Sequence, residues 1–183
     1  MDLPPHGLSD DNQFHVIDGG YLLRRVVWDY DVTFREFIQR YRRYVRIRFG
    51  NQHSTIVFDG KPNGLSTKDH EHTRRNLKTS ISVDTSVHLD NTIGSVSQKS
   101  FLANSNNKQA FTELLANALR EDGHNVILCQ GDADVSIVSS VLDVACLGQN
   151  VTLIASDADL LIMLLYMCNN LMGEIIIEER SYS

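Results

Sequence analysis

The chain has 183 residues, of which 42% are hydrophobic and 22% are charged, and its formal net charge at pH 7 is −6. These values suit one soluble globular domain with a sizeable core, and they argue against a protein coated in basic charge. The longest apolar run, residues 160–168, is too short to span a bilayer. Three widely spaced cysteines (Cys129, Cys146 and Cys168) favour buried thiols over a disulfide framework or a zinc site. We therefore expect an intracellular protein of the nucleus or cytoplasm, with no membrane partner.

Residues 1–13 are polar, contain two prolines and lack the apolar core of a signal peptide. We expect them to form a flexible leader ahead of a single domain over residues 14–183. Phe14–Ile17 is a short apolar run that predicts a buried strand. This strand ends at Asp18, and the two glycines that follow permit a sharp turn close to a bound ion or phosphate.

A helix is predicted over Asp31–Phe49, because apolar residues recur there at helical spacing and Gly50 ends the pattern. The other face of this helix is basic and includes Arg42 and Arg43. Such a face is either solvated or in contact with the phosphates of a nucleic acid.

The apolar run Ser54–Phe58 predicts a second buried strand, which ends at Asp59. A loop and a helix that ends near Lys78 follow, and they carry several cations. A zinc site at residues 70–72, which read His-Glu-His, is disfavoured because these positions do not share a helix face. The cations of this segment are Lys61, Lys68, Arg74 and Arg75.

Residues 79–105 are rich in Ser, Asn and Thr and have little periodicity, which predicts a long mobile loop inside the domain. A clear amphipathic helix is predicted next, over Asn107–Asp122. Near the end of the chain, the β-branched run within Glu174–Glu178 predicts a last strand.

Between these elements one arrangement occurs twice: an apolar strand ends and two aspartates, one residue apart, follow within a few residues. The strands are predicted over Val126–Cys129 and Val151–Ala155, and each is followed by a helix. One aspartate of each pair is expected as a helix cap, but a cap needs only one carboxylate. The paired aspartates are Asp132 and Asp134 after the first strand, and Asp157 and Asp159 after the second.

Loops that follow the carboxyl ends of parallel strands line one edge of a sheet, so these carboxylates and those of Asp18 and Asp59 are expected together. Like charges held close are costly in a partly buried site, and hard divalent cations such as Mg²⁺ or Mn²⁺ remove that cost. The set describes a two-metal centre, in which ions about 4 Å apart activate a water and stabilise the leaving oxygen of a phosphodiester.

These residues resemble the motifs of the flap endonuclease/XPG type of 5′ nuclease, within the PIN-like superfamily. In that family an early Asp follows the first strand, a second Asp lies in a Phe-Asp-Gly-Lys-Pro turn, a basic helix follows, and two acidic pairs come last. The matching positions here are Asp18, Phe58–Pro62, Lys68 with Glu71, Arg74 and Arg75, Asp132 with Asp134, and Asp157 with Asp159.

The resemblance implies an α/β fold, a PIN-like parallel sheet with helices on both faces, and Mg²⁺- or Mn²⁺-dependent hydrolysis of DNA or RNA with single-stranded or flap character. One ion would be held by Asp18, Asp59, Asp132 and Asp134, and the other by Asp134, Asp157 and Asp159. Lys68 and Arg75 would contact the scissile phosphate as catalytic residues. Lys61, Arg74, Arg42 and Arg43 are candidates for substrate binding.

The chain departs from the family in three respects, the first being the expected leader of residues 1–13 in place of the family's free N-terminus close to the site. The first acidic pair has Asp where the family usually has Glu, and a C-terminal helix-two-turn-helix element is not expected here. The alternative function is therefore a PIN-like scaffold that binds nucleic acid or protein without cutting. A different Mg²⁺ enzyme, such as a phosphohydrolase, is disfavoured because its Asp-x-Asp would follow the first strand, where this chain has Asp18 and two glycines.

Overall fold

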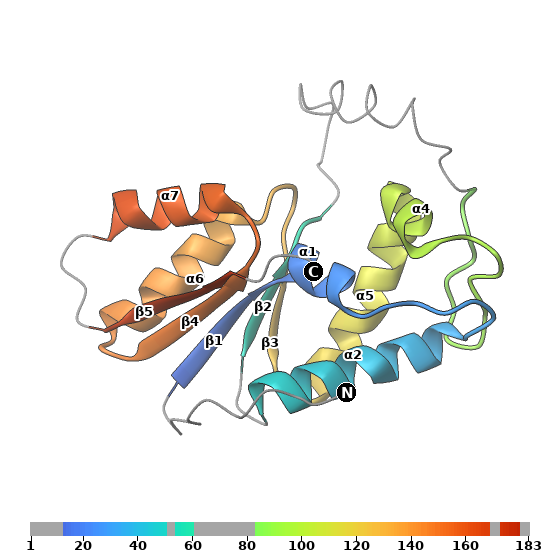
Figure 1. Ribbon diagram of the computed structural model, residues 1–183, viewed down its shortest axis with the longest axis horizontal. Coiled ribbons are helices and arrows are strands. Elements are labelled where there is room, and N and C mark those ends of the chain that lie inside the picture. The colour runs from blue at the N-terminus through green and yellow to red at the C-terminus, as the bar shows by residue number, and fades with distance from the viewer. Residues whose placement is uncertain (1–12, 51–53, 61–82, 169–172, 180–183) are drawn as a thin grey trace.

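The computed structural model describes residues 13–50, 54–60, 83–168 and 173–179. Five strands form one sheet in the order β3-β2-β1-β4-β5, and all four pairings are parallel, as expected for the α/β fold class (Figure 1). The strands are β1 (Gln13–Asp18), β2 (Thr55–Phe58), β3 (Asn125–Leu128), β4 (Asn150–Ala155) and β5 (Ile175–Glu179).

Neighbouring residues of the central strands are buried on opposite faces because both faces of the sheet are covered. In β1 the neighbouring residues Val16 and Ile17 are both fully buried, and they belong to different hydrophobic clusters on opposite faces. Val57 and Ile56 of β2 divide in the same way. This is the pattern of a buried parallel sheet, and it explains why these strands lack the alternation of polar and apolar residues.

Helices cover both faces of the sheet, which confirms that part of the prediction (Figure 1). On one face lie α1 (Gly19–Arg25), α2 (Phe34–Phe49), α4 (Gln98–Ala103) and α5 (Ser105–Glu121), and on the other lie α6 (Asp134–Cys146) and α7 (Ala158–Met167).

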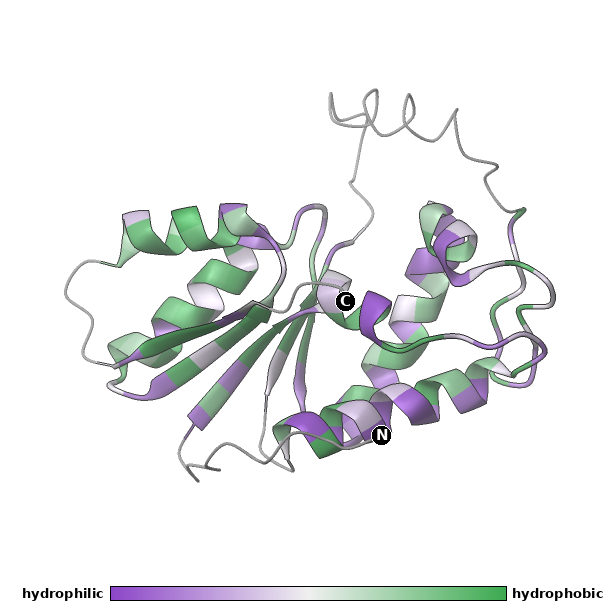
Figure 2. Ribbon diagram, viewed as in Figure 1, coloured by the Kyte–Doolittle hydropathy of each residue, from purple (hydrophilic) through white to green (hydrophobic). Residues whose placement is uncertain are grey.

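α7 differs from the other helices in being largely hydrophobic, as its colour in Figure 2 shows. Leu160 and Leu164 pack inward, whereas Ile162, Leu165 and Tyr166 are exposed. In the part of the chain that the structure describes, no helix is both long and apolar enough to cross a membrane. The prediction of buried thiols is wrong, since Cys146 is exposed and Cys129 and Cys168 are half-buried.

The segment after residue 82 differs from the predicted loop. Residues 98–103 form helix α4, and its Phe101 is fully buried against Trp28 at a ring-centroid distance of 5.2 Å. Burying a phenylalanine contributes about 2 kcal/mol, so this contact anchors the segment to the core. The prediction of a structureless loop is therefore wrong for residues 98–103.

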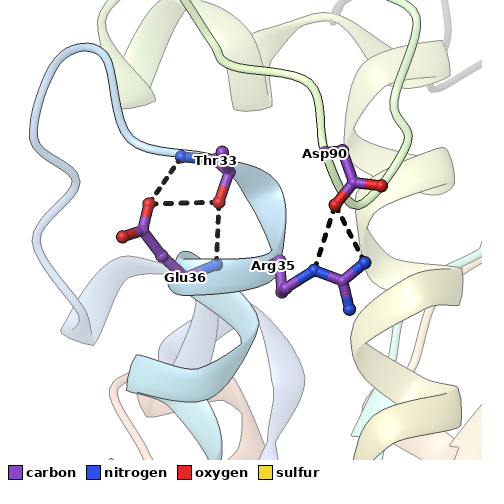
Figure 3. Close-up of polar contacts among 4 residues, drawn as sticks. All are labelled: Thr33, Arg35, Glu36 and Asp90. Carbon is purple, nitrogen blue, oxygen red and sulfur yellow. Dashed lines mark hydrogen bonds and ion pairs between the residues drawn. The ribbon is translucent and has the colours of Figure 1, made fainter.

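The same segment is joined to the start of α2 (Figure 3). The backbone N–H of Arg35 donates to the carbonyl of Leu89 at 2.8 Å, and the Arg35 side chain pairs with Asp90. A capping box between Thr33 and Glu36, in which each side chain accepts from the other's backbone N–H, starts α2 at residue 34 rather than 31.

The order of the strands reverses direction within the sheet. The chain passes from β1 to β2 and β3 on one side of β1, then crosses to β4 and β5 on the other side. Parallel sheets bind ligands beyond the carboxyl ends of the strands at such a reversal. Here the reversal lies between β1, which ends at Asp18, and β4, which is followed by Asp157.

Candidate functional site

The carboxylate of Asp18 lies at the junction of β1 and α1. It caps α1 by accepting a hydrogen bond from the Gly20 N–H at 2.7 Å. Glycine at position 19 permits a close approach to β2, because a Cβ at this position would lie 2.1 Å from the ring of Phe58. Asp18 is thereby held at the edge of the sheet with its backbone close to β2.

Asp59 follows β2 and is tied to the beginning of α6. Its Oδ1 accepts a hydrogen bond from the backbone N–H of Ala133 at 3.1 Å. The loops touch directly, since the N–H of Gly60 donates to the carbonyl of Gly131 at 3.0 Å. A Cβ at Gly60 would lie 1.6 Å from the carbonyl oxygen of Cys129, so only glycine permits this approach.

The two Asp-x-Asp pairs share one local geometry. Asp132 Oδ1 accepts from the backbone N–H of Asp134 at 3.2 Å, and Asp157 Oδ1 accepts from that of Asp159 at 2.9 Å. Asp157 is also the N-cap of α7. In the second pair, therefore, Asp157 caps a helix, and the carboxylate of Asp159 is not needed for that cap.

Carboxylates from the end of β1 and from three loops act on one another's charge. The pKa of Asp134 is raised to about 6, first by burial and then by the negative charges of Asp132, Asp157, Asp59 and Asp18. Burial also raises the pKa of Asp18; the hydrogen bond from Gly20 opposes this rise and the charge of Asp59 adds to it. We call these five aspartates the acidic edge. The sixth predicted ligand, Asp159, is exposed in the first turn of α7.

Two cations belong to this edge and were not predicted there. Lys108 Nζ, from the first turn of α5, lies 3.3 Å from Asp59 Oδ2. Arg24 of α1 acts on Asp18, where its charge lowers the pKa of that carboxyl. The position of Lys108 could have been predicted from the topology. A helix that precedes a parallel strand is antiparallel to that strand, so the first turn of the helix lies at the carboxyl edge of the sheet.

The donor set fits a hard divalent cation, because it consists of carboxylates, three of them half-buried, whose charges act on Asp134. As the side chains are placed, however, the described ranges contain no group of three His, Cys, Asp or Glu close enough to hold one ion. Binding an ion here would therefore require some of these side chains to turn toward one another.

The predicted phosphate contacts divide into two groups. Lys61, Lys68, Arg74 and Arg75, together with residues 70–72, lie outside the described residues, and their roles stay predictions. Arg42 and Arg43 are described, and the structure does not bring them to the acidic edge. Arg42 pairs with Asp122, three residues before β3 begins, so this part of α2 lies at the opposite edge of the sheet.

Most of the basic face of α2 is neutralised by carboxylates. Arg35, Arg40, Arg42 and Arg48 form ion pairs with Asp90, Asp29, Asp122 and Glu178. Arg43 and Arg46 instead line an open cavity of about 510 Å³, together with Gln39, Arg42, Gly50, Asp122 and His124. The structure thus supports a paired, solvated face for much of this helix, with a basic hollow at its C-terminal half.

Comparison of the chain with protein-family models, with curated proteins and with solved structures found no match.

Proposed function

We propose that this chain is a metal-dependent nuclease of the flap-endonuclease-like, PIN-like kind, which hydrolyses phosphodiester bonds of DNA or RNA with two Mg²⁺ or Mn²⁺ ions. The observation that carries the proposal is the acidic edge. The pKa of Asp134 is raised to about 6, first by burial and then by the charges of four carboxylates at or beyond the ends of parallel strands. Two of these carboxylates, Asp18 and Asp157, lie at the reversal of strand order, where parallel sheets bind their ligands.

The raised pKa of Asp134 indicates that the fully ionised edge is destabilised without a counter-charge. A divalent cation supplies that charge and prefers oxygen ligands. Asp18, Asp59, Asp132 and Asp134 would hold one ion, and Asp134, Asp157 and Asp159 the other. When bound, the ions would supply a nucleophilic water and charge stabilisation at the leaving oxygen.

The chain's own backbone anchors two of these carboxylates before any ion arrives, whereas others must still turn toward the ion. The Ala133 N–H holds Asp59 toward α6, and the Gly20 N–H orients Asp18. Such pre-orientation limits the reorganisation needed on binding. The cations predicted to hold the scissile phosphate are Lys68 and Arg75, with Lys61 and Arg74 as further contacts.

Cleavage of labelled single-stranded, duplex and 5′-flap DNA, and of matching RNA, tests the proposal in Mg²⁺, Mn²⁺ or EDTA. We expect cutting that needs metal and is lost in Asp157→Asn. Asp143→Asn is the matched control, since Asp143 is exposed on α6 outside the acidic edge. Metal-independent cutting, or equal cutting by both variants, would contradict the proposal.

The alternative is a scaffold that binds nucleic acid or protein without cutting. The ion pair of Lys108 with Asp59 favours it, because a protein cation already neutralises one carboxylate. Binding of the same oligonucleotides with no cleavage in any metal would support the scaffold.

A further inference from the structure

Asp59 is engaged through both of its oxygens, from two different elements. Oδ1 accepts from the Ala133 N–H at 3.1 Å, and Oδ2 lies 3.3 Å from Lys108 Nζ. The first contact is to rigid backbone at the start of α6. The second is to the end of a flexible side chain of α5, so it can be exchanged without moving either helix.

The ion pair is accessible from solvent. The side chains of Lys108 and Asp59 are 32% and 40% exposed. Pairs of this kind are weak, because water screens the attraction and the lysine stem loses freedom. A divalent ion at Asp59 carries twice the charge of the ammonium and therefore competes well for that carboxylate.

The charges around the pair are unequal. The acidic edge has five carboxylates, and two cations of the described residues, Lys108 and Arg24, act on it. Arg24 acts on Asp18 from α1, whereas Lys108 contacts Asp59 from α5. Lys108 is thus the cation seated against a predicted metal ligand.

We propose that Lys108 is a displaceable counter-ion of the acidic edge. It pairs with Asp59 while no divalent ion is bound, is released when the ion takes that carboxylate, and then contacts the phosphate of the substrate. This inference rests on the proposed function and assigns a residue to it that the family motifs above do not include.

Lysine suits this exchange better than arginine. Its ammonium is a compact charge on a flexible stem, and it binds phosphate as a point charge, whereas arginine locks onto carboxylates through two parallel hydrogen bonds. Arg42 makes that kind of paired contact with Asp122 in this protein. A released Lys108 would remain beside the edge and stabilise charge that develops on the phosphate.

The first test is Mn²⁺ titration by calorimetry without substrate, on the full chain. Lys108→Met should bind Mn²⁺ about tenfold more tightly than wild type at low salt, because a competing positive charge is gone. Lys99→Met removes the same charge from an exposed position on α4 and should leave the affinity unchanged. Equal or weaker binding by Lys108→Met would overturn the proposal.

The second test is single-turnover cleavage at saturating Mn²⁺. Lys108→Met should cut about 10-fold to 100-fold more slowly than Lys99→Met, and Lys108→Arg should recover part of the rate, because it restores the positive charge. A rate for Lys108→Met equal to that of Lys99→Met would overturn the phosphate contact. Thermal unfolding in EDTA checks folding, and Lys108→Gln replaces Lys108→Met if the latter does not fold.

Failure of this inference is distinguishable from failure of the proposed function. If wild type neither binds Mn²⁺ nor cuts, the proposed function fails and Lys108 loses its role with it. If wild type binds and cuts while the Lys108 variants match Lys99→Met in both measurements, only the role of Lys108 is wrong.

Discussion

Asp59 and Ala133 are joined by a 3.1 Å hydrogen bond from the Ala133 N–H to Asp59 Oδ1, although 74 residues separate them in the chain. This bond fixes the loop after β2 against the first turn of α6, directly before Asp134. The carboxylates that follow β2 and β3 are therefore held together by backbone contacts, and their mutual repulsion is a built-in property of the fold.

Asp134→Asn should stabilise the metal-free protein at pH 7.5. The folded-state pKa of Asp134, about 6, lies above its unfolded value, so the ionised carboxylate destabilises the folded state above pH 6. We expect a gain of about 1 kcal/mol, reduced from the full shift by solvent screening. Because Asp134 takes up a proton in the folded state as the pH falls, the gain should shrink toward zero near pH 4. Thermal unfolding in EDTA from pH 4 to 8 measures this, and a gain independent of pH would contradict it.

Gly60→Ala should damage both stability and the site. The added Cβ would meet the Cys129 carbonyl at 1.6 Å, which forces the two loops apart. We expect a loss of about 2–4 kcal/mol in denaturant unfolding, and weaker Mn²⁺ binding. Gly94→Ala is the control, because Gly94 has φ +64 but nothing within 4 Å of a Cβ. Its cost should be only about 1 kcal/mol of backbone strain, with Mn²⁺ binding unchanged. Equal stability and equal Mn²⁺ affinity in the two variants would show that the close approach at Gly60 is unimportant.

The basic hollow on α2 makes a separate prediction. If nucleic acid extends to it, Arg43→Gln with Arg46→Gln should weaken binding and reduce the salt dependence of the association constant by about two phosphate contacts. The single-turnover cleavage rate at saturating substrate should not change, because this surface lies at the opposite edge of the sheet from the carboxylates. Arg35→Gln, which removes an arginine already paired with Asp90, serves as the control. Identical salt slopes for the double variant and the control would exclude this surface from binding.

Lys68→Ala with Arg75→Ala should slow cleavage more than it weakens binding, since both are predicted to contact the scissile phosphate. Single-turnover rates and equilibrium binding of the same oligonucleotide separate the two effects. Equal losses in both would make them binding residues.

The sequence predicted the strands well, for a physical reason. Buried parallel strands must be continuously apolar, so each strand end is marked where a carboxylate interrupts the run, as at Asp18 and Asp59. The carboxyl ends of parallel strands share one edge, which is why aspartates that follow different strands were predicted to lie near one another.

What the sequence did not predict depends on single contacts. Phe101 is one aromatic residue in a polar stretch, and only its burial against Trp28 shows that residues 98–103 are packed as a helix. Lys108 lies in the helix predicted over Asn107–Asp122, but its contact with Asp59 depends on where α5 starts. The basic face of α2 looked available for phosphate, whereas partners distant in sequence, such as Asp122, neutralise much of it.

The most direct test of the central claim is a calorimetric Mn²⁺ titration of wild type beside Asp18→Asn and Asp157→Asn, with Asp143→Asn as control. The acidic edge should bind two ions per chain in wild type and in the control, with at least one site lost or strongly weakened in each of the other variants. No Mn²⁺ binding by wild type, or the same binding by all four proteins, would contradict a metal centre built from the loops of these parallel strands.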